Sequence, residues 1–329
     1  MLACTFGDCR RGQYPAALLR CKFDAPSACC GVVDYHNAPT NDFEALLGGS
    51  IYYEDYINTE TAICDYLQTK CRSSKKMMLS FDEYGNMFGT QSKLNFGYSP
   101  KANLHRSFYQ FNPDAKYVRH DPDNMGEGMM HGNQGDMIQA LGNTSAQLAF
   151  LRHADRVKIG CMTGGIGALA ASDHDHVWKS ASYYPYSHLI RYGRGTSLKT
   201  IVDCETFDIE GYYMDDGNQF QKREGIPYLD TAAALNEEKK ELTIFVIQRK
   251  WDAEMGVDID VSGFSDWTFV EHIQMYSDDR EARSSFDHPD LIQPAVNRET
   301  RLEDGKIHAT LKPLSWNVFR LEKKPMVQE

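Results

Sequence analysis

Two adjacent carboxylates, Asp82 and Glu83, are the residues of this sequence best placed to do chemistry. They follow the mostly apolar run Met77–Phe81 and precede Gly85, which predicts a short buried strand and its end. A strand that delivers acids to its carboxyl end is the layout of an active site in a barrel or open α/β sheet. Because side chains alternate along a strand, only one of the two acids is expected to face a given site. The alternative is a strand end with two solvated acids, since acidic residues mostly lie on surfaces.

The elements that position these acids read as α/β units. A helix is predicted over residues 52–70, with Tyr56, Ile63 and Leu67 on its buried face. The acid-bearing strand follows, and a second helix over residues 135–153 then precedes a strand over 156–162. Helix followed by strand, twice over, favours a parallel sheet covered by helices.

Two other stretches lack a clear period. Residues 1–33 hold five of the nine cysteines and read as an irregular N-terminal segment, while residues 35–42 read as a polar loop. The segment from Asn86 to His131 is rich in aromatic residues among Gly, Pro and Asn. A loop this long is usually functional and could pack on sugar rings, or its aromatic side chains could simply pin it to the body of the protein.

After about Leu198 the pattern changes to short apolar runs separated by turns. They occur at residues 226–232, 242–248, 257–261, 268–275, 306–311 and 316–321. This spacing predicts an all-β sandwich, and we expect it to pack on the α/β part as a structural domain.

Composition excludes several classes of function. The 329 residues carry a formal charge of −11, which argues against nucleic acid or anionic lipid as the main partner. No window approaches the ~18 uninterrupted apolar residues of a membrane span. The cysteines are odd in number and form no Cys-x-x-Cys pair, so we expect reduced thiols in a cytoplasmic protein, with neither a metal site nor a cofactor.

Several motifs, in order along the chain, resemble those of the α-L-arabinofuranosidases of glycoside hydrolase family 51. They are Leu79–Tyr84 (LSFDEY), Leu151–Lys158 (LRHADRVK), Tyr183–Pro185 (YYP), Tyr192–Gly195 (YGRG), Pro227–Asp230 (PYLD) and Ser315–Val318 (SWNV). Together the matches span roughly residues 34–322. Several separate matches in the same order are far more specific than any one of them.

The resemblance implies a fold and a division of the chain. Residues 34–197 would form the C-terminal part of a (β/α)8 TIM barrel, with Met77–Phe81 as its seventh strand and Val157–Met162 as its eighth. Residues 198–329 would form a C-terminal β-sandwich. Residues 1–33 would be an irregular start, not native to the fold.

The resemblance also implies a retaining glycosidase, in which two carboxyl groups work as a pair. Glu83 would be the nucleophile, and Tyr35, Asp82, Asn86 and Trp178 would contact the substrate. The substrate would be an arabinose-containing oligosaccharide or polysaccharide, arabinoxylan or arabinan, from which terminal arabinofuranosyl groups are removed.

The sequence also departs from the family pattern. No Asn-Glu pair precedes Glu83, so the acid/base residue is not identified, and Tyr84 stands where the family has Trp. We therefore expect the C-terminal portion of a longer enzyme, weakly active or inactive as given. Exposed strand edges would favour a homo-oligomer. A non-catalytic glycan-binding or structural protein and an endo-β-glucanase of the same family stay open as alternatives.

Overall fold

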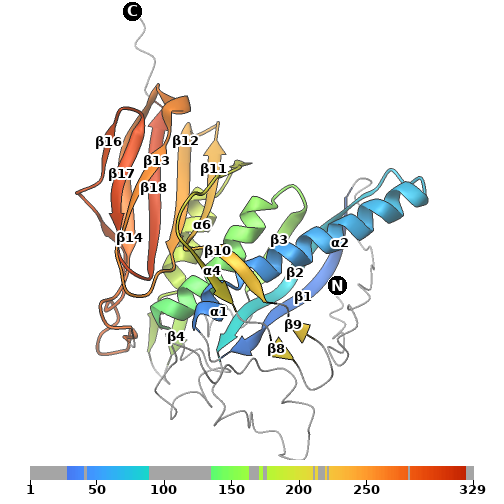
Figure 1. Ribbon diagram of the computed structural model, residues 1–329, viewed down its shortest axis with the longest axis horizontal. Helices are drawn as coiled ribbons and strands as arrows, with labels where there is room; N and C mark the ends of the chain where they lie inside the picture. Colours follow the sequence, from blue (N-terminus) through green and yellow to red (C-terminus); the bar gives the residue numbers. More distant parts are fainter. Residues whose placement is uncertain are drawn as a thin grey trace, which may run out of the picture.

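The computed structural model describes residues 28–40, 43–88, 135–162, 170–172, 176–209, 212–213, 219–220, 222–280 and 282–323. A parallel sheet with helices lies beside a larger antiparallel part, and the long helix α2 projects away from it (Figure 1). Within the described ranges, no helix is both long and apolar enough to cross a membrane.

Three parallel strands form the first sheet: β1 (Ala28–Thr40), β2 (Lys76–Phe88) and β3 (Val157–Met162), in that spatial order. Helices α1 (Phe43–Leu47) and α2 (Ser50–Lys70) separate β1 from β2, and α4 (Met137–Arg152) separates β2 from β3. The predicted helices and the second and third strands are confirmed, and so is their βαβ order.

The strand β1 corrects two expectations. Residues 28–33 are not irregular, and residues 35–40 are not a loop, because the whole stretch pairs in parallel with β2 from Ala28 opposite Lys76 onward. Hydrogen bonds to β2, a strand distant in sequence, stabilise this backbone. The pattern of apolar residues within β1 therefore does not reveal that it is a strand.

The end of β2 was also predicted wrongly. The strand does not stop at Gly85 but continues to Phe88, with Gly85 and Asn86 opposite His36 and Asn37 of β1. A glycine weakens a strand, but backbone pairing with β1 keeps β2 extended on both sides of Gly85.

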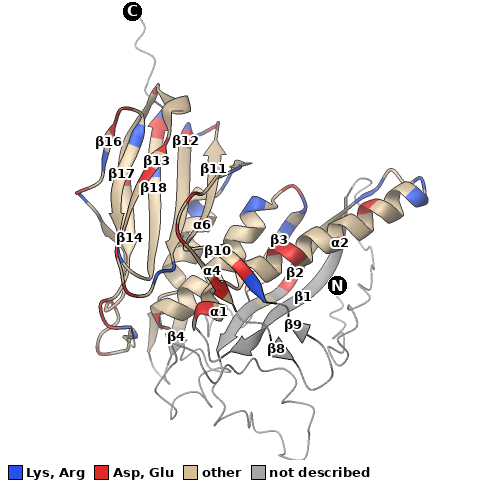
Figure 2. Cartoon of the chain, viewed as in Figure 1, with Lys and Arg blue, Asp and Glu red and all other residues tan. Residues whose placement is uncertain are grey.

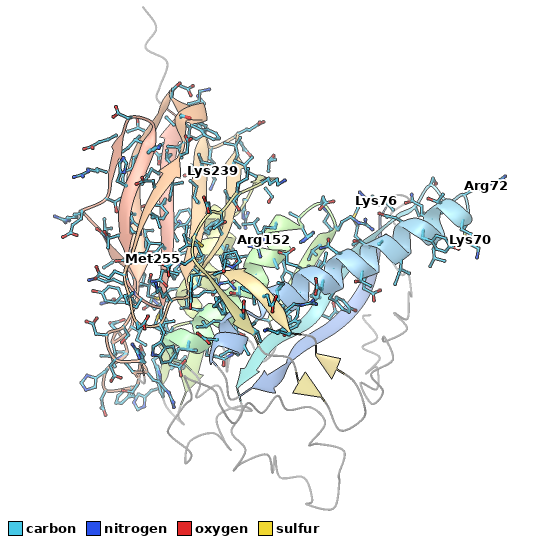
Figure 3. The ribbon with its side chains drawn as sticks, in the orientation of Figure 1. Lys70, Arg72, Lys76, Arg152, Lys239 and Met255 are labelled. Atoms are coloured by element: carbon cyan, nitrogen blue, oxygen red, sulfur yellow. The ribbon has the colours of Figure 1, made fainter. Side chains whose placement is uncertain are left out.

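The buried face of helix α2 matches the predicted one only at Tyr56, which is half-buried and packs on Phe81. Ile63 and Leu67 are 45% and 39% exposed, whereas Tyr53 and Ile57 are fully buried. Those two side chains pack with β2 and α4 in a cluster that includes Phe81 and Phe150. The far end of α2 and the stretch that follows it carry four exposed cations, Lys70, Arg72, Lys75 and Lys76. Basic residues colour the projecting end of the helix in Figure 2, and Lys70 and Arg72 are labelled there in Figure 3.

Helix α4 is the most buried helix of the described chain, with 12 of its 16 residues buried. The carboxylate of Asp136 accepts a hydrogen bond from the Gln139 amide at 2.9 Å and so caps its first turn. Ala146 and Ala149 face the parallel sheet, whereas Met137 and Leu141 belong to a core shared with the antiparallel part. The helix is therefore enclosed between two sheets.

A six-stranded antiparallel sheet and a three-stranded sheet make up most of the second part. The larger sheet has the order β15 (Ala295–Val296), β14 (Trp267–Met275), β18 (Ser315–Lys323), β12 (Glu241–Gln248), β11 (Leu229–Asn236), β6 (Thr196–Leu198). The smaller has the order β13 (Met255–Asp260), β17 (Lys306–Leu311), β16 (Arg301–Glu303), and the short helix η3 (Ser262–Phe264) follows β13.

Both faces of the larger sheet are covered. Ile244 and Phe319 pack toward the three-stranded sheet, whereas Phe245, Trp316 and Val318 pack against α4 and its neighbours. This explains why β12 and β18 read as nearly continuous apolar runs. The predicted docking of the β-part onto the α/β part is confirmed.

Shorter elements complete the described chain. They are the hairpins β4 (Ala170–Ser172) with β5 (Val177–Lys179) and β8 (Tyr212–Tyr213) with β9 (Gln219–Phe220), the pair β7 (Thr206–Ile209) with β10 (Arg223–Pro227), and helix α6 (Tyr183–Tyr192). The expected strand over residues 226–232 is divided at Tyr228 between β10 and β11, which join different sheets. The larger sheet begins with β6, two residues before Leu198.

A buried polar network lies in the β-part around His272, which is fully buried. Its Nε2 lies 3.0 Å from Asn317 Oδ1 and its Nδ1 lies 2.7 Å from Thr300 Oγ1, which fits a neutral ring with the hydrogen on Nε2. Burial lowers the pKa of His272 to about 4, although the hydrogen bond with Asn317 opposes this.

Acid is therefore expected to destabilise the protein through His272. The unfolded chain binds a proton below about pH 6.5, whereas the folded chain does so only near pH 4. The contribution of His272 to the free energy of unfolding is thus fully present above pH 6.5. It falls by about 3 kcal/mol as the pH drops to 4. Denaturant unfolding at pH 7 and pH 4.5 should show a smaller loss in His272→Gln than in the wild type. Equal losses would contradict the assignment.

Candidate active site

The strand that carries the two acids contains a β-bulge at their position. On one side, Val33 pairs with Phe81 and the next residue of β1, Asp34, pairs with Glu83. On the other side, Phe81 pairs with Gly160 and Tyr84 with Met162, so β2 again has one residue more than its neighbour. Bulges of this kind occur next to active sites, where they change the direction of a side chain.

Side-chain packing shows the effect of the bulge. The rings of Phe81 and Tyr84 both pack on Phe150 of α4, with centroid distances of 4.5 and 4.9 Å. Residues three apart cannot share one face of a regular strand, because side chains alternate. The regular alternation is therefore broken once between Phe81 and Tyr84.

Asp82 is held from its own strand. The hydroxyl of Ser80 donates to Asp82 Oδ1 at 2.8 Å, so these two side chains share one face of β2. Ser80 is buried and Asp82 is half-buried. The bond fixes the carboxylate at the point where the bulge begins.

Tyr84 is anchored to α4 by a polar contact within an apolar cluster. Its side chain is 1% exposed, and Gln147 Nε2 donates to its hydroxyl oxygen at 3.1 Å. Burial raises the pKa of Tyr84 far above its ordinary value, and the hydrogen bond from Gln147 only partly offsets this. The phenol therefore stays neutral around pH 7.

Three predicted site residues lie in the parallel sheet, where the structure describes their backbone only. Glu83 is opposite Asp34, Tyr35 is opposite Tyr84, and Asn86 is opposite Asn37. The backbones of Tyr35 and Glu83 are thus one register step apart on neighbouring strands. Most of the aromatic segment from Asn86 to His131 lies outside the described residues.

Trp178, the fourth predicted substrate contact, lies on β5 after the parallel sheet. Its indole nitrogen donates to the backbone carbonyl of Ser284 at 2.9 Å. Beside it, the His176 ring packs on Phe286, which is 50% exposed, with centroids 3.7 Å apart. Trp178 therefore connects the β4–β5 hairpin to the segment between β14 and β15.

A pocket of about 250 Å³ lies between the sheet and the helices. Its walls come from β2, α4, β3 and α6, and include Tyr84, Gln147, Phe150, Gly160 and Tyr186. It is therefore on the helix side of the sheet. In the parts of the chain that the structure describes, no group of three His, Cys, Asp or Glu residues could hold a metal ion.

An ionic cluster, half-buried at Arg152 and Glu54 and fully buried at Asp230 and Arg249, joins the two parts of the molecule, and sequence reasoning missed it. Arg152 on α4 donates from Nε to Glu54 and from Nη1 to Asp230 of β11, both at 2.7 Å. His153 also contacts Glu54, and Arg249 Nη2 lies 3.2 Å from the other oxygen of Asp230. Arg152 lies at the junction between α4 and the antiparallel sheet (Figure 3).

The electrostatics of the cluster favour its charged form. Burial alone would raise the pKa of Asp230, but the charges of Arg249 and Arg152 hold it below its ordinary value. Burial would likewise raise the pKa of Glu54, which the contacts with His153 and Arg152 lower. Arg152, His153 and Asp230 belong to the motifs that carried the family resemblance, so part of that signature is structural.

The geometry can now be compared with known proteins. The family model described as the alpha-L-arabinofuranosidase C-terminal domain matches residues 110–315, which is more than half of the chain. The chain belongs to this family. The match covers α4, β3 and the antiparallel part as far as the first residue of β18, and it does not include β1 or β2.

Relatives of this arabinofuranosidase family agree with the assignment. The intracellular exo-alpha-(1->5)-L-arabinofuranosidase 1 of Bacillus subtilis is 27% identical over 88% of this chain and 51% of its own length. The corresponding protein of Acetivibrio thermocellus is 27% identical over 88% of this chain and 52% of its own length. The chain therefore spans about half the length of these relatives.

Solved structures show the same fold. A family 51 alpha-L-arabinofuranosidase from Bifidobacterium longum superposes with a TM-score of 0.68 at 18% identity, over 89% of this chain and 53% of that one. An arabinose complex of the alpha-L-arabinofuranosidase from Thermotoga maritima superposes with a TM-score of 0.64 at 18% identity. The superposition covers 88% of this chain and 52% of that one. The resemblance to a C-terminal portion of family 51 arabinofuranosidases is thus confirmed.

Proposed function

We propose that the protein is an arabinofuranosidase-like retaining glycosidase in which Glu83 is the nucleophile. The observation that carries the proposal is the position of residue 83 in a β-bulge, in the strand of a parallel sheet that holds the family's LSFDEY motif. Bulges at such positions accompany active sites. Proximity of Tyr35 on the next strand supports the same location.

The fold assignment follows from the same strands. β1, β2 and β3 would be the last three strands of a (β/α)8 barrel, and the two packed antiparallel sheets would be the family's β-sandwich. Parallel order and intervening helices support the first part. The apolar core between the six-stranded and three-stranded sheets supports the second.

The chemistry would be a double displacement. A carboxylate oxygen of Glu83 bonds to the anomeric carbon while the bond from that carbon to the leaving oxygen breaks. The leaving oxygen takes up a proton from solvent or from an acid that the sequence does not identify. Water then attacks the anomeric carbon and gives up a proton while the ester bond to Glu83 breaks, which releases arabinose and restores the carboxylate. Asp82, Asn86, Tyr35 and Trp178 would contact the sugar.

The substrate class is inferred from the relatives. We expect terminal α-1,5-linked L-arabinofuranosyl groups of arabino-oligosaccharides, because the proteins from B. subtilis and A. thermocellus carry that activity in their names. The same names place those relatives inside the cell, and we propose a cytoplasmic location here. Assembly into a homo-oligomer is also proposed, since the outer edge of the parallel sheet is unpaired within the described residues.

The experiment that tests the proposal uses 4-nitrophenyl α-L-arabinofuranoside and the full chain. 4-Nitrophenolate is a good leaving group, so its departure depends little on a protonating residue and the step carried by Glu83 is measured directly. We expect 4-nitrophenol release with this substrate to be at least about 10²-fold faster than cleavage of an arabino-oligosaccharide. No release from the activated substrate would contradict the proposal.

Calorimetry distinguishes the proposed glycosidase from the alternative of a non-catalytic glycan-binding protein. Binding of arabino-oligosaccharides without turnover of the activated substrate, unchanged by Glu83→Gln, would favour that function. Exposed aromatic side chains such as Phe286, which packs on the His176 ring, could serve either protein.

A further inference from the structure

The position of the bulge in β2 determines which residue after Phe81 faces the helices. Regular alternation from Phe81 would place residue 83 toward α4, whereas the bulge gives that position to Tyr84. The helix side of the sheet is an apolar layer that includes Phe150 and Leu79. A carboxylate there would be desolvated without a partner, and a slip of one residue would move the acid away from any substrate.

Two interactions of Tyr84 fix this choice. Its ring packs edge-on against Phe150, and its hydroxyl accepts the hydrogen bond from Gln147 at 3.1 Å. Any aromatic residue at position 84 would keep the ring contact with Phe150. The hydrogen bond is more specific, because it requires a hydroxyl group within reach of Gln147 Nε2. Gly160 on β3 leaves room for Phe150, since a Cβ there would lie 3.0 Å from that ring.

We propose that the hydrogen bond between Tyr84 and Gln147 is a positioning contact that holds the bulge and thereby orients Glu83 for attack on the sugar. The inference rests on the proposed function of Glu83 and adds a role for two residues outside the substrate site. Tyr84 acts through its neighbour in the strand and does not touch the sugar.

The test combines Tyr84→Phe, Gln147→Leu and the double variant. Each single variant is expected to lower kcat for 4-nitrophenyl α-L-arabinofuranoside by about 10- to 100-fold, because small misplacements of a reacting group have effects of this size. KM should change little, since the sugar contacts remain. The double variant should lose no more than either single variant, because both remove the same bond.

A second readout excludes a merely structural effect. The acidic limb of the pH–kcat profile should shift in Tyr84→Phe, because it reports ionisation of a carboxylate whose surroundings have changed. The phenol cannot cause this shift, since burial keeps it neutral. Tyr53→Phe removes another buried phenol from the same cluster and should leave kcat and the profile unchanged.

Covalent labelling distinguishes failure of the inference from failure of the proposed function. An epoxide with the arabinofuranose configuration should be opened by the Glu83 carboxylate, which forms an ester while the epoxide oxygen takes a proton from water. Peptide mapping should find the whole reagent on Glu83, with slower labelling in Tyr84→Phe. Equal labelling rates would overturn the inference alone, and an unlabelled wild type would overturn both.

Discussion

Replacing Glu83 by Gln is expected to reduce release of 4-nitrophenol from the activated arabinofuranoside by on the order of 10³- to 10⁶-fold. The amide matches the carboxylate in shape but cannot form the glycosyl ester. The neighbouring Asp82→Asn is the matched control, because that side chain is hydrogen-bonded to Ser80 at 2.8 Å. It should raise KM and leave kcat within about tenfold of the wild type.

Chemical rescue would give this result a mechanism. In Glu83→Ala the space of the carboxylate is free, so added azide should attack the anomeric carbon and restore part of the 4-nitrophenol release. Arabinofuranosyl azide should then appear as a product. A Glu83→Gln variant with more than a tenth of the wild-type rate, or an alanine variant that azide does not rescue, would remove Glu83 from its proposed role.

Replacing Asp230 by Ala is expected to lower the free energy of unfolding by about 3–5 kcal/mol. The carboxylate is 4% exposed and lies between Arg152 and Arg249, and its removal leaves both guanidinium groups without this partner. Loss of one member of a buried ion pair destabilises far more than the pair itself stabilises. Urea unfolding of the full chain at pH 7 measures the difference.

An exposed ion pair provides the control for this variant. Lys250 Nζ lies 2.5 Å from a carboxylate oxygen of Glu205, whose side chain is 67% exposed. Glu205→Ala should therefore change the free energy of unfolding by no more than about 1 kcal/mol. Equal effects of the two variants would show that the cluster around Asp230 contributes no more than a surface contact.

The parts of the fold that were predictable are those whose sequence pattern reflects local burial. α4 has its apolar residues at helical spacing, and β12 and β18 are apolar runs bounded by turns. β1 could not be predicted in this way, because its sequence has neither a helical nor a strand period and its backbone is paired with β2. The buried face of α2 was missed because Tyr53 and Ile57 were outweighed by the apolar but exposed Ile63 and Leu67.

The candidate site was located by its motif, but its geometry was not. Alternation is the default for a strand, and the bulge at Asp82 and Glu83 depends on the registers of two neighbours that the sequence does not specify. The ionic cluster did leave a signal. Asp230 stands within the run Leu229–Ala234 and Arg249 directly follows β12, and a charge inside an apolar run indicates a buried partner.

The enclosure of α4 between two sheets has a consequence for how the protein unfolds. One side of the helix completes the core of the parallel sheet, and the other completes the core against the β-part. Unfolding of either sheet would expose one face of α4 and so disrupt the core that the helix shares with the other sheet. We therefore expect the parallel strands and the antiparallel sheets to unfold in one cooperative transition, because neither core is complete without α4.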